Sequence, residues 1–396
     1  MQTKTFRTKS VFLEKKNPEP RSYWPVAIDI GYSSVKGYSP NSTYIFPSYA
    51  RSLGKHPALL TEPGPETIIY RDGDTGEQWL VGADAQRSVD AFDTNDSQLE
   101  LYGRDRYYSP MFRVLIRTAI ALGMMPNSEG GYAGDKPLYI QTGLPPAYLD
   151  DDAETFKDAI EGKHSFSIKT GKTQKFVPFN LDISRKNINI MSQPQGTLVG
   201  LSCYDDARSI ADAAKFVGSS VLMFDGGFGT LDIFDIKGAT IHSKQTFTDL
   251  GMREVLQTLS DKIKKKYNIT IQPSALQNVL ETGTVKVKKR KGNEISSRAE
   301  DISDLLEDAS SEVCSKAIAR VMNSYAIESY KYLIVTGGTG AAWFDQIAKH
   351  FENVDGLEVI RGNEYSPATD MVCCNVRGYY VGRVNNLIKM ENKKAS

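Results

Sequence analysis

The fold is decided by the stretch VLMFDGGFGTLDIFDI at residues 221–236. Its apolar start, residues 221–224, is typical of a buried strand, and the alternating residues 231–236 are typical of a second strand paired with the first. Three of the four positions 226–229 are glycine, so backbone N–H groups can turn inward on a phosphate without obstruction by a β-carbon. Asp225 stands at the mouth of this turn, where a carboxylate can hold hydrated Mg²⁺. Taken alone, however, a glycine-rich hairpin is more often a plain tight turn.

The chain repeats this pattern near its start. Residues 26–36, VAIDIGYSSVK, align without gaps on residues 222–232, so that Asp29 falls on Asp225. Two hairpins of one design predict a duplicated fold in which two phosphate-binding loops face each other.

Two shorter motifs accompany the hairpins. The sequence GGTG at residues 337–340 follows an apolar run and lets a nucleoside approach the backbone closely. Gln195 lies in the segment SQPQGT, just past an expected strand at residues 188–191. Polar residues at such positions often carry the chemistry of α/β folds, and an ordinary strand-to-helix turn is the alternative.

The composition is that of a globular protein without a charge bias. A length of 396 residues favours two domains, because single cores rarely exceed about 250–300 residues. The 48 Lys and Arg residues equal the 48 Asp and Glu residues, which leaves no net basic field for nucleic acid or anionic lipid. No apolar run approaches the roughly eighteen residues of a membrane span, no signal peptide is evident, and the four cysteines form no CxxC pattern. We therefore expect a cytoplasmic protein without membrane contact or direct sequence-specific contact with DNA.

Three charged segments have simple interpretations. Residues 1–23 carry six Lys or Arg against two Glu and are expected to form a flexible arm, either solvated or used in docking. The TGKT at residues 170–173 is not a P-loop, because Phe166 occupies the position of the leading glycine, so we expect a turn. The basic run ETGTVKVKKRKG at residues 281–292 is expected to be a solvated surface, with a DNA-contacting loop as the alternative.

The motifs DIGYSSVK, DGGFGTLD and VTGGTG, with a Pro-Gln turn between the first two, resemble those of the superfamily of actin, the heat-shock chaperone ATPases and the sugar kinases. Within it, the chain is most similar to the bacterial actin-like proteins of the ParM type, which segregate plasmids. The TGLP segment, the FKDAIEGKHSFSI stretch and the late NVRGYY helix add to this resemblance, which covers the chain from residue 24 to about residue 387. The resemblance implies an α/β, actin-like fold of two domains, each with a duplicated βββαβα core, and a nucleotide cleft between them.

The resemblance also divides the chain. Domain I is expected at residues 24–195, with a smaller inserted subdomain at about 40–130. Domain II is expected at residues 196–369, with a smaller subdomain at about 252–330. Residues 370–396 are expected to form a C-terminal helix that returns to domain I.

By the same resemblance the cleft would bind ATP, or GTP, with Mg²⁺. Asp29 and Asp225 would bind Mg²⁺ through water, and Gln195 would position the water that attacks the phosphate. The phosphates would be held by Ser33, Ser34, Lys36, Gly226, Gly227, Gly229 and Thr230, and the nucleoside would be bordered by Gly337, Gly338 and Thr339.

Gln195 departs from the ParM type, in which glutamate is expected at this position, whereas eukaryotic actin has glutamine. A glutamine side chain cannot take up a proton at neutral pH, so it can orient the attacking water but cannot act as its base. Because phosphoryl transfer depends mainly on positioning and charge neutralisation, we expect slow hydrolysis, suited to a timer on a filament.

The function implied by the resemblance is that of an ATPase that polymerises into dynamic filaments and segregates plasmid DNA. Its expected partners are further copies of itself and a DNA-binding adaptor protein of the ParR type. A chromosomal actin-like cytoskeletal protein would carry the same motifs and remains open. A sugar or small-molecule kinase would need an Asp base near the position of Gln195, and that base is absent.

Overall fold

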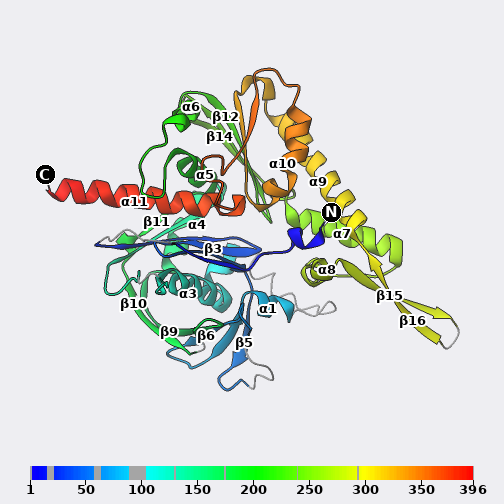
Figure 1. Ribbon diagram of the computed structural model, residues 1–396, viewed down its shortest axis with the longest axis horizontal. Coiled ribbons are helices and arrows are strands. Elements are labelled where there is room, and N and C mark those ends of the chain that lie inside the picture. Colours follow the sequence, from blue (N-terminus) through cyan, green and yellow to red (C-terminus); the bar gives the residue numbers. More distant parts are fainter. Residues whose placement is uncertain are drawn as a thin grey trace.

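The chain forms two α/β domains, seen in a computed structural model that describes residues 2–15, 22–57, 64–88, 104–128, 131–173, 175–238, 240–291 and 294–395 (Figure 1). The long helix α11 (Cys374–Ala395) runs between the two main sheets in this view, with the main sheet of domain I below it and the sheet of domain II above. None of the helices in the described part of the chain is long and apolar enough to span a membrane.

A six-stranded sheet forms the centre of domain I, in the order β1-β4-β3-β2-β8-β11. All seven residues of β2 are buried, because α3 packs on one part of the strand and α11 on another. β2, β3 and β4 are antiparallel neighbours, whereas β8 and β11 run parallel to β2. The strands are β1 (Val11–Glu14), β2 (Trp24–Ile30), β3 (Ser34–Tyr38), β4 (Ser42–Pro47), β8 (Leu138–Leu144) and β11 (Ile188–Ser192).

The sheet of domain II repeats this arrangement without the edge strand. Its order, β14-β13-β12-β17-β18, corresponds strand by strand to β4-β3-β2-β8-β11, with the same antiparallel and parallel pairs. The duplicated core predicted from the two hairpins is therefore confirmed. The strands are β12 (Ser220–Gly226), β13 (Leu231–Lys237), β14 (Thr240–Phe247), β17 (Tyr332–Thr336) and β18 (Glu358–Arg361).

Helices cover both sheets and close a hydrophobic core in each domain. In domain I, Phe112 and Leu115 of α3 are fully buried against the sheet, and the Ser109 hydroxyl caps this helix by accepting from the Phe112 N–H. In domain II, Trp343 of α10 packs in the core that α7 and α9 also build. The principal helices are α3 (Pro110–Met124), α4 (Leu149–Asp158), α5 (Gln193–Ser202), α7 (Met252–Tyr267), α9 (Ser303–Ser324) and α10 (Gly338–Phe351).

The smaller part of domain I is built from two separate stretches of chain. Its five-stranded sheet has the order β10-β9-β6-β7-β5 and combines strands from residues 50–81 with strands from residues 162–183. The single insertion expected at about 40–130 differs from this, because β4 and α3 belong to the main sheet while β9 and β10 join the smaller one. The strands are β5 (Ala50–Gly54), β6 (Ile68–Asp72), β7 (Gln78–Val81), β9 (Gly162–Thr170) and β10 (Val177–Ile183). The TGKT sequence forms the turn between β9 and β10, as predicted.

The smaller part of domain II lies between β14 and β17. It comprises α7, α8 (Leu276–Thr282), a two-stranded hairpin and α9, which together span residues 252–324. The hairpin, β15 (Thr284–Lys291) and β16 (Glu294–Asp301), contains most of the basic run and projects from the body of the protein (Figure 1).

The two domains are joined where α5 crosses α11. A β-carbon at Gly378 would lie 1.6 Å from the Gly196 carbonyl oxygen, so the backbones of the two helices touch at this point. Glycine at both positions therefore permits a contact that any larger residue would prevent.

The N-terminal segment differs from the flexible arm expected at residues 1–23. Residues 3–6 form a 3-10 helix, and β1 pairs with β4 at the edge of the domain I sheet. The part of the expected arm at residues 16–21 lies outside the described residues.

Candidate functional site

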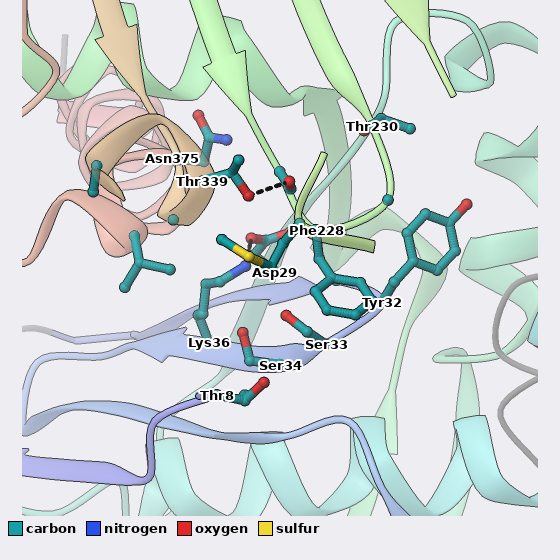
Figure 2. A pocket seen from close by; sticks show the side chains of 18 of the residues that line it. Thr8, Asp29, Tyr32, Ser33, Ser34, Lys36, Phe228, Thr230, Thr339 and Asn375 are labelled. Carbon is teal, nitrogen blue, oxygen red and sulfur yellow. Dashed lines mark hydrogen bonds and ion pairs between the residues drawn. The ribbon is translucent and has the colours of Figure 1, made fainter. Parts of the chain in front are cut away.

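A cavity of about 490 Å³ lies where the two domains face each other. It is lined by the first hairpin (β2–β3), the second hairpin (β12–β13) and the start of α10. Figure 2 shows side chains of the first hairpin on one side of the cavity and those of the second hairpin on the other. The volume is within the range of small-molecule sites, about 300–1,000 Å³.

The turns of the two hairpins have the same backbone hydrogen bond. The Gly31 N–H donates to the Ser34 carbonyl oxygen at 3.0 Å, and at the equivalent positions the Gly227 N–H donates to the Thr230 carbonyl oxygen at 2.8 Å. The repeat seen in the sequence is thus also a repeat of turn geometry.

The two turns approach each other closely. A β-carbon at Gly229 would lie 2.4 Å from Cδ2 of Tyr32, so only glycine allows the second turn to pack against the aromatic ring of the first. Phe228 and Tyr32 lie together at this meeting point (Figure 2). Arg106 packs over the Tyr32 ring at 5.0 Å from its centroid and also lines the cavity.

The first hairpin supplies a buried ion pair. Lys36 Nζ lies 2.9 Å from Asp29 Oδ2, and both side chains are largely buried. Burial alone would disfavour the ammonium, but the Asp29 carboxylate raises the pKa of Lys36. Lys36 is therefore charged at neutral pH, next to the place where a phosphate would lie.

The second hairpin supplies two buried carboxyl groups. Burial, opposed by a hydrogen bond from Asn375 and aided by the charge of Asp29, raises the pKa of Asp225 to about 6. Asn375 Nδ2 of α11 donates to Asp225 Oδ2 at 2.7 Å. Burial and the nearby charge of Asp225 raise the pKa of Asp232 to about 7. These two carboxyl groups therefore hold their protons more tightly than exposed aspartates do.

The third glycine motif forms the start of α10. Gly337 has a φ of 82°, and a β-carbon there would lie 2.3 Å from the Gly226 carbonyl oxygen. Thr339 Oγ1 donates to the Gly227 carbonyl oxygen at 2.6 Å, which fixes this helix start against the second hairpin. Gly337, Gly338 and Thr339 line the cavity, so the positive dipole end of α10 lies at its wall, an arrangement that favours anions.

The expected water-positioning residue, Gln195, is not in the cavity. Gln195 is exposed on α5, whereas Gln193, the first residue of that helix, lines the cavity. Gln193 Nε2 donates to Asp29 Oδ1 at 3.2 Å. The sequence predicted Gln195 for this position, whereas Gln193 is the glutamine of this helix that lines the cavity.

Most other predicted site residues meet at the cavity. Gly226 does not line it, because it packs against the start of α10, where a β-carbon would lie 2.6 Å from the Gly340 nitrogen. The predicted residues that do line it are Asp29, Ser33, Ser34, Lys36, Asp225, Gly227, Gly229, Thr230, Gly337, Gly338 and Thr339.

Several cavity residues were missed by the sequence reasoning. Asn375 stands at the start of NVRGYY, a motif noted without a role, and Asp232 was visible as the last residue of DGGFGTLD. Arg106 and residues 5–9 carried no sequence signal, since both reach the cavity only through long-range packing.

The two aspartates fit a site for Mg²⁺. Asp29 and Asp225 are 3% and 4% exposed and line the same cavity, where Lys36 is paired with Asp29. In the described ranges, no group of three or more His, Cys, Asp or Glu side chains gathers around a point where a metal ion would sit. Two carboxylates suit Mg²⁺ held through its own waters, because this ion keeps several waters and completes its shell with phosphate oxygens.

Comparison with known proteins shows which fold this chain shares. Residues 27–196 match the family model of the N-terminal domain of actin-like proteins. A 15-stranded ParM filament from Clostridium botulinum matches with a TM-score of 0.67 at 20% identity, over 91% of this chain and 99% of that one. This chain has the actin-like fold. The actin-like resemblance predicted from the three glycine motifs is therefore confirmed.

Two further structures show how widely this actin-like fold is matched. The actin-like protein Alp7A has a TM-score of 0.65 at 17% identity, over 94% of this chain and 99% of its own. The archaeal actin homolog Ta0583, solved in complex with ADP, has a TM-score of 0.56 at 16% identity, over 90% of this chain and 98% of its own. A sequence search of the curated proteins finds no match to this chain.

Proposed function

We propose that this actin-like chain is a nucleotide-driven ATPase that polymerises into dynamic filaments. One observation carries the proposal: two hairpin turns with the same backbone hydrogen bond, each preceded by a buried aspartate, face each other across a cavity between two domains. Such turns place backbone N–H groups around phosphates from both sides. The likeness in fold to a ParM filament supports the polymerisation step.

The side chains of the cavity have separate roles in the proposed nucleotide hydrolysis. Asp29 and Asp225 would hold Mg²⁺ through water, and the bound ion would neutralise charge on the phosphates. Lys36, kept charged by Asp29, binds a phosphate oxygen. Gln193 orients the attacking water and cannot take its proton, so hydrolysis is slow.

In the cell, we propose that these filaments move plasmid DNA through a DNA-bound adaptor of the ParR type, in the cytoplasm. The balanced charge of the chain supports an adaptor over direct DNA contact, since 48 basic residues offset 48 acidic ones. The alternative, a chromosomal cytoskeletal filament, shares the site and differs only in its partner.

The test is right-angle light scattering of the purified protein after addition of Mg-ATP, and separately Mg-GTP, with phosphate release followed in the same cuvette. A rise in scattering that decays as phosphate accumulates is the expected result. Flat scattering with bound nucleotide would overturn autonomous polymerisation and redirect the search to small-molecule phosphate acceptors.

A matched pair of variants ties the result to the cavity. Asp225→Asn removes a buried carboxylate from the cavity and is expected to abolish both signals. Asp212→Asn makes the same chemical change at an exposed position away from the cavity and is expected to leave both unchanged. Equal behaviour of the two variants would contradict the assignment of the site.

A further inference from the structure

The N-terminal segment connects the two domains along one wall of the cavity. At one end, β1 pairs with β4 in domain I, and the Lys15 N–H donates to the Asn41 carbonyl oxygen at 2.7 Å. At the other end, the Phe6 side chain, 9% exposed, is part of the hydrophobic core of domain II. In Figure 1 the N-terminus accordingly lies beside α7 and α8.

Polar contacts hold the segment against α8 of domain II. Thr3 Oγ1 donates to the Leu280 carbonyl oxygen at 2.9 Å, although these residues are 277 positions apart in the sequence. The Thr8 N–H donates to Gln277 Oε1, also at 2.9 Å. Each contact joins the segment to backbone or side-chain atoms of one short helix, so the segment is seated at a defined position.

Two ion pairs add to these contacts. Arg7 pairs with Glu281 at the end of α8. Lys9 Nζ lies 2.6 Å from Asp370 Oδ2, just before α11 begins. Both pairs connect the segment to chain that lies more than 250 positions away.

Between these attachments the segment forms part of the cavity wall. Residues 5–9 line the same cavity as both hairpins. Figure 2 shows Thr8 beside Ser34 and Lys36, which are predicted phosphate-binding residues. The segment therefore faces the space that a nucleotide would occupy.

We propose that residues 5–9 are a strap that holds the nucleotide in the cleft and must detach before the nucleotide can leave. The proposal rests on the nucleotide-binding function proposed above. Phe6 and Val11 are fixed in different domains and are separated by five residue steps, which span at most about 18 Å when fully extended. The domains consequently cannot open widely while both attachments persist.

The experiment measures dissociation of a fluorescent mant-ATP from the full-length monomer, chased with unlabelled Mg-ATP below the polymerising concentration. Phe6→Ala removes the anchor in domain II and is expected to accelerate dissociation by about tenfold or more. Phe351→Ala is the matched control, because Phe351 is 4% exposed in the same core but does not line the cavity. It is expected to leave dissociation unchanged.

A charge exchange tests the strap without altering the core. Arg7→Glu is expected to accelerate dissociation about threefold, and the added change Glu281→Arg is expected to restore it, because Arg7 pairs with Glu281. Unchanged dissociation in both Phe6→Ala and Arg7→Glu would overturn the strap, as would equal acceleration in Phe351→Ala. Absence of mant-ATP binding to the unaltered protein would instead overturn the proposed function, and the strap with it.

Discussion

The crossing of α5 and α11 makes a sharp prediction about Gly378. An added β-carbon would lie 1.6 Å from the Gly196 carbonyl oxygen, whereas β-carbon contacts under 3.0 Å are essentially never seen. The two helices would therefore have to separate by about 1.4 Å, and because the clashing atom belongs to the backbone, no rotamer change relieves the contact. Overpacking of this kind costs about 1–3 kcal/mol or more, against about 1 kcal/mol gained from the higher helix propensity of alanine.

We expect Gly378→Ala to lower the free energy of unfolding by about 2 kcal/mol, the upper end of the overpacking cost less the propensity gain, measured by urea titration of tryptophan fluorescence. The same separation would pull Asn375 away from Asp225, which it contacts at 2.7 Å, so nucleotide affinity is expected to fall as well. Gly382→Ala is the control on the same helix, because its β-carbon would meet Met191 at an ordinary 3.4 Å. That variant is expected to be as stable as the unaltered protein or up to about 1 kcal/mol more stable. Equal stability of the two variants would refute the close crossing.

Three other outcomes test the cavity. Gln193→Ala is expected to slow phosphate release about a hundredfold, because the attacking water loses its positioning group, whereas the exposed Gln195→Ala leaves the rate unchanged in the same phosphate assay. Burial raises the pKa of Asp232 from 3.8 to about 7, so the folded protein binds this proton more tightly than the unfolded chain does. The resulting stabilisation is complete below the unfolded pKa and is lost as the pH rises through about 7. In Mg²⁺-free urea titrations, the free energy of unfolding of the unaltered protein is therefore expected to lose about 2–4 kcal/mol between about pH 4 and pH 8 through this group, and Asp232→Asn is expected to remove that loss. Parallel pH curves for the two proteins would contradict this. Lys36→Met leaves Asp29 buried without the ammonium that lies 2.9 Å from it, and is expected to lower the free energy of unfolding by about 3 kcal/mol. Adding Asp29→Asn to this variant is expected to restore most of the loss. A double variant no more stable than Lys36→Met would argue against the buried pair.

The duplicated core and most of the cavity were readable from the sequence because their determinants are local. The turn bond from Gly31 to Ser34 and its counterpart from Gly227 to Thr230 each close within four residues, so the repeated local motif marks both turns. Alternation and apolar runs marked the strands on either side. For these parts, a short stretch of chain carries all of the information that fixes its shape.

Local sequence did not show whether Gln193 or Gln195 faces the cavity. This depends on where α5 begins, and the helix starts at Gln193. Residues two positions apart on a helix point about 200° apart, so a start at this residue turns Gln193 to the cavity and Gln195 to solvent. Element boundaries are set by packing, here by the contact of α5 with α11.

Short stretches of the sequence specify the duplicated α/β fold, the two hairpin turns and the aspartates that precede them. Only the tertiary structure decided that strands from residues 50–81 and 162–183 share one sheet, and that the N-terminal segment crosses the cleft. The physical reason is sequence separation. A turn is specified by the conformational preferences of adjacent residues, whereas the docking of Phe6 depends on apolar surface presented by helices more than 200 residues further along the chain.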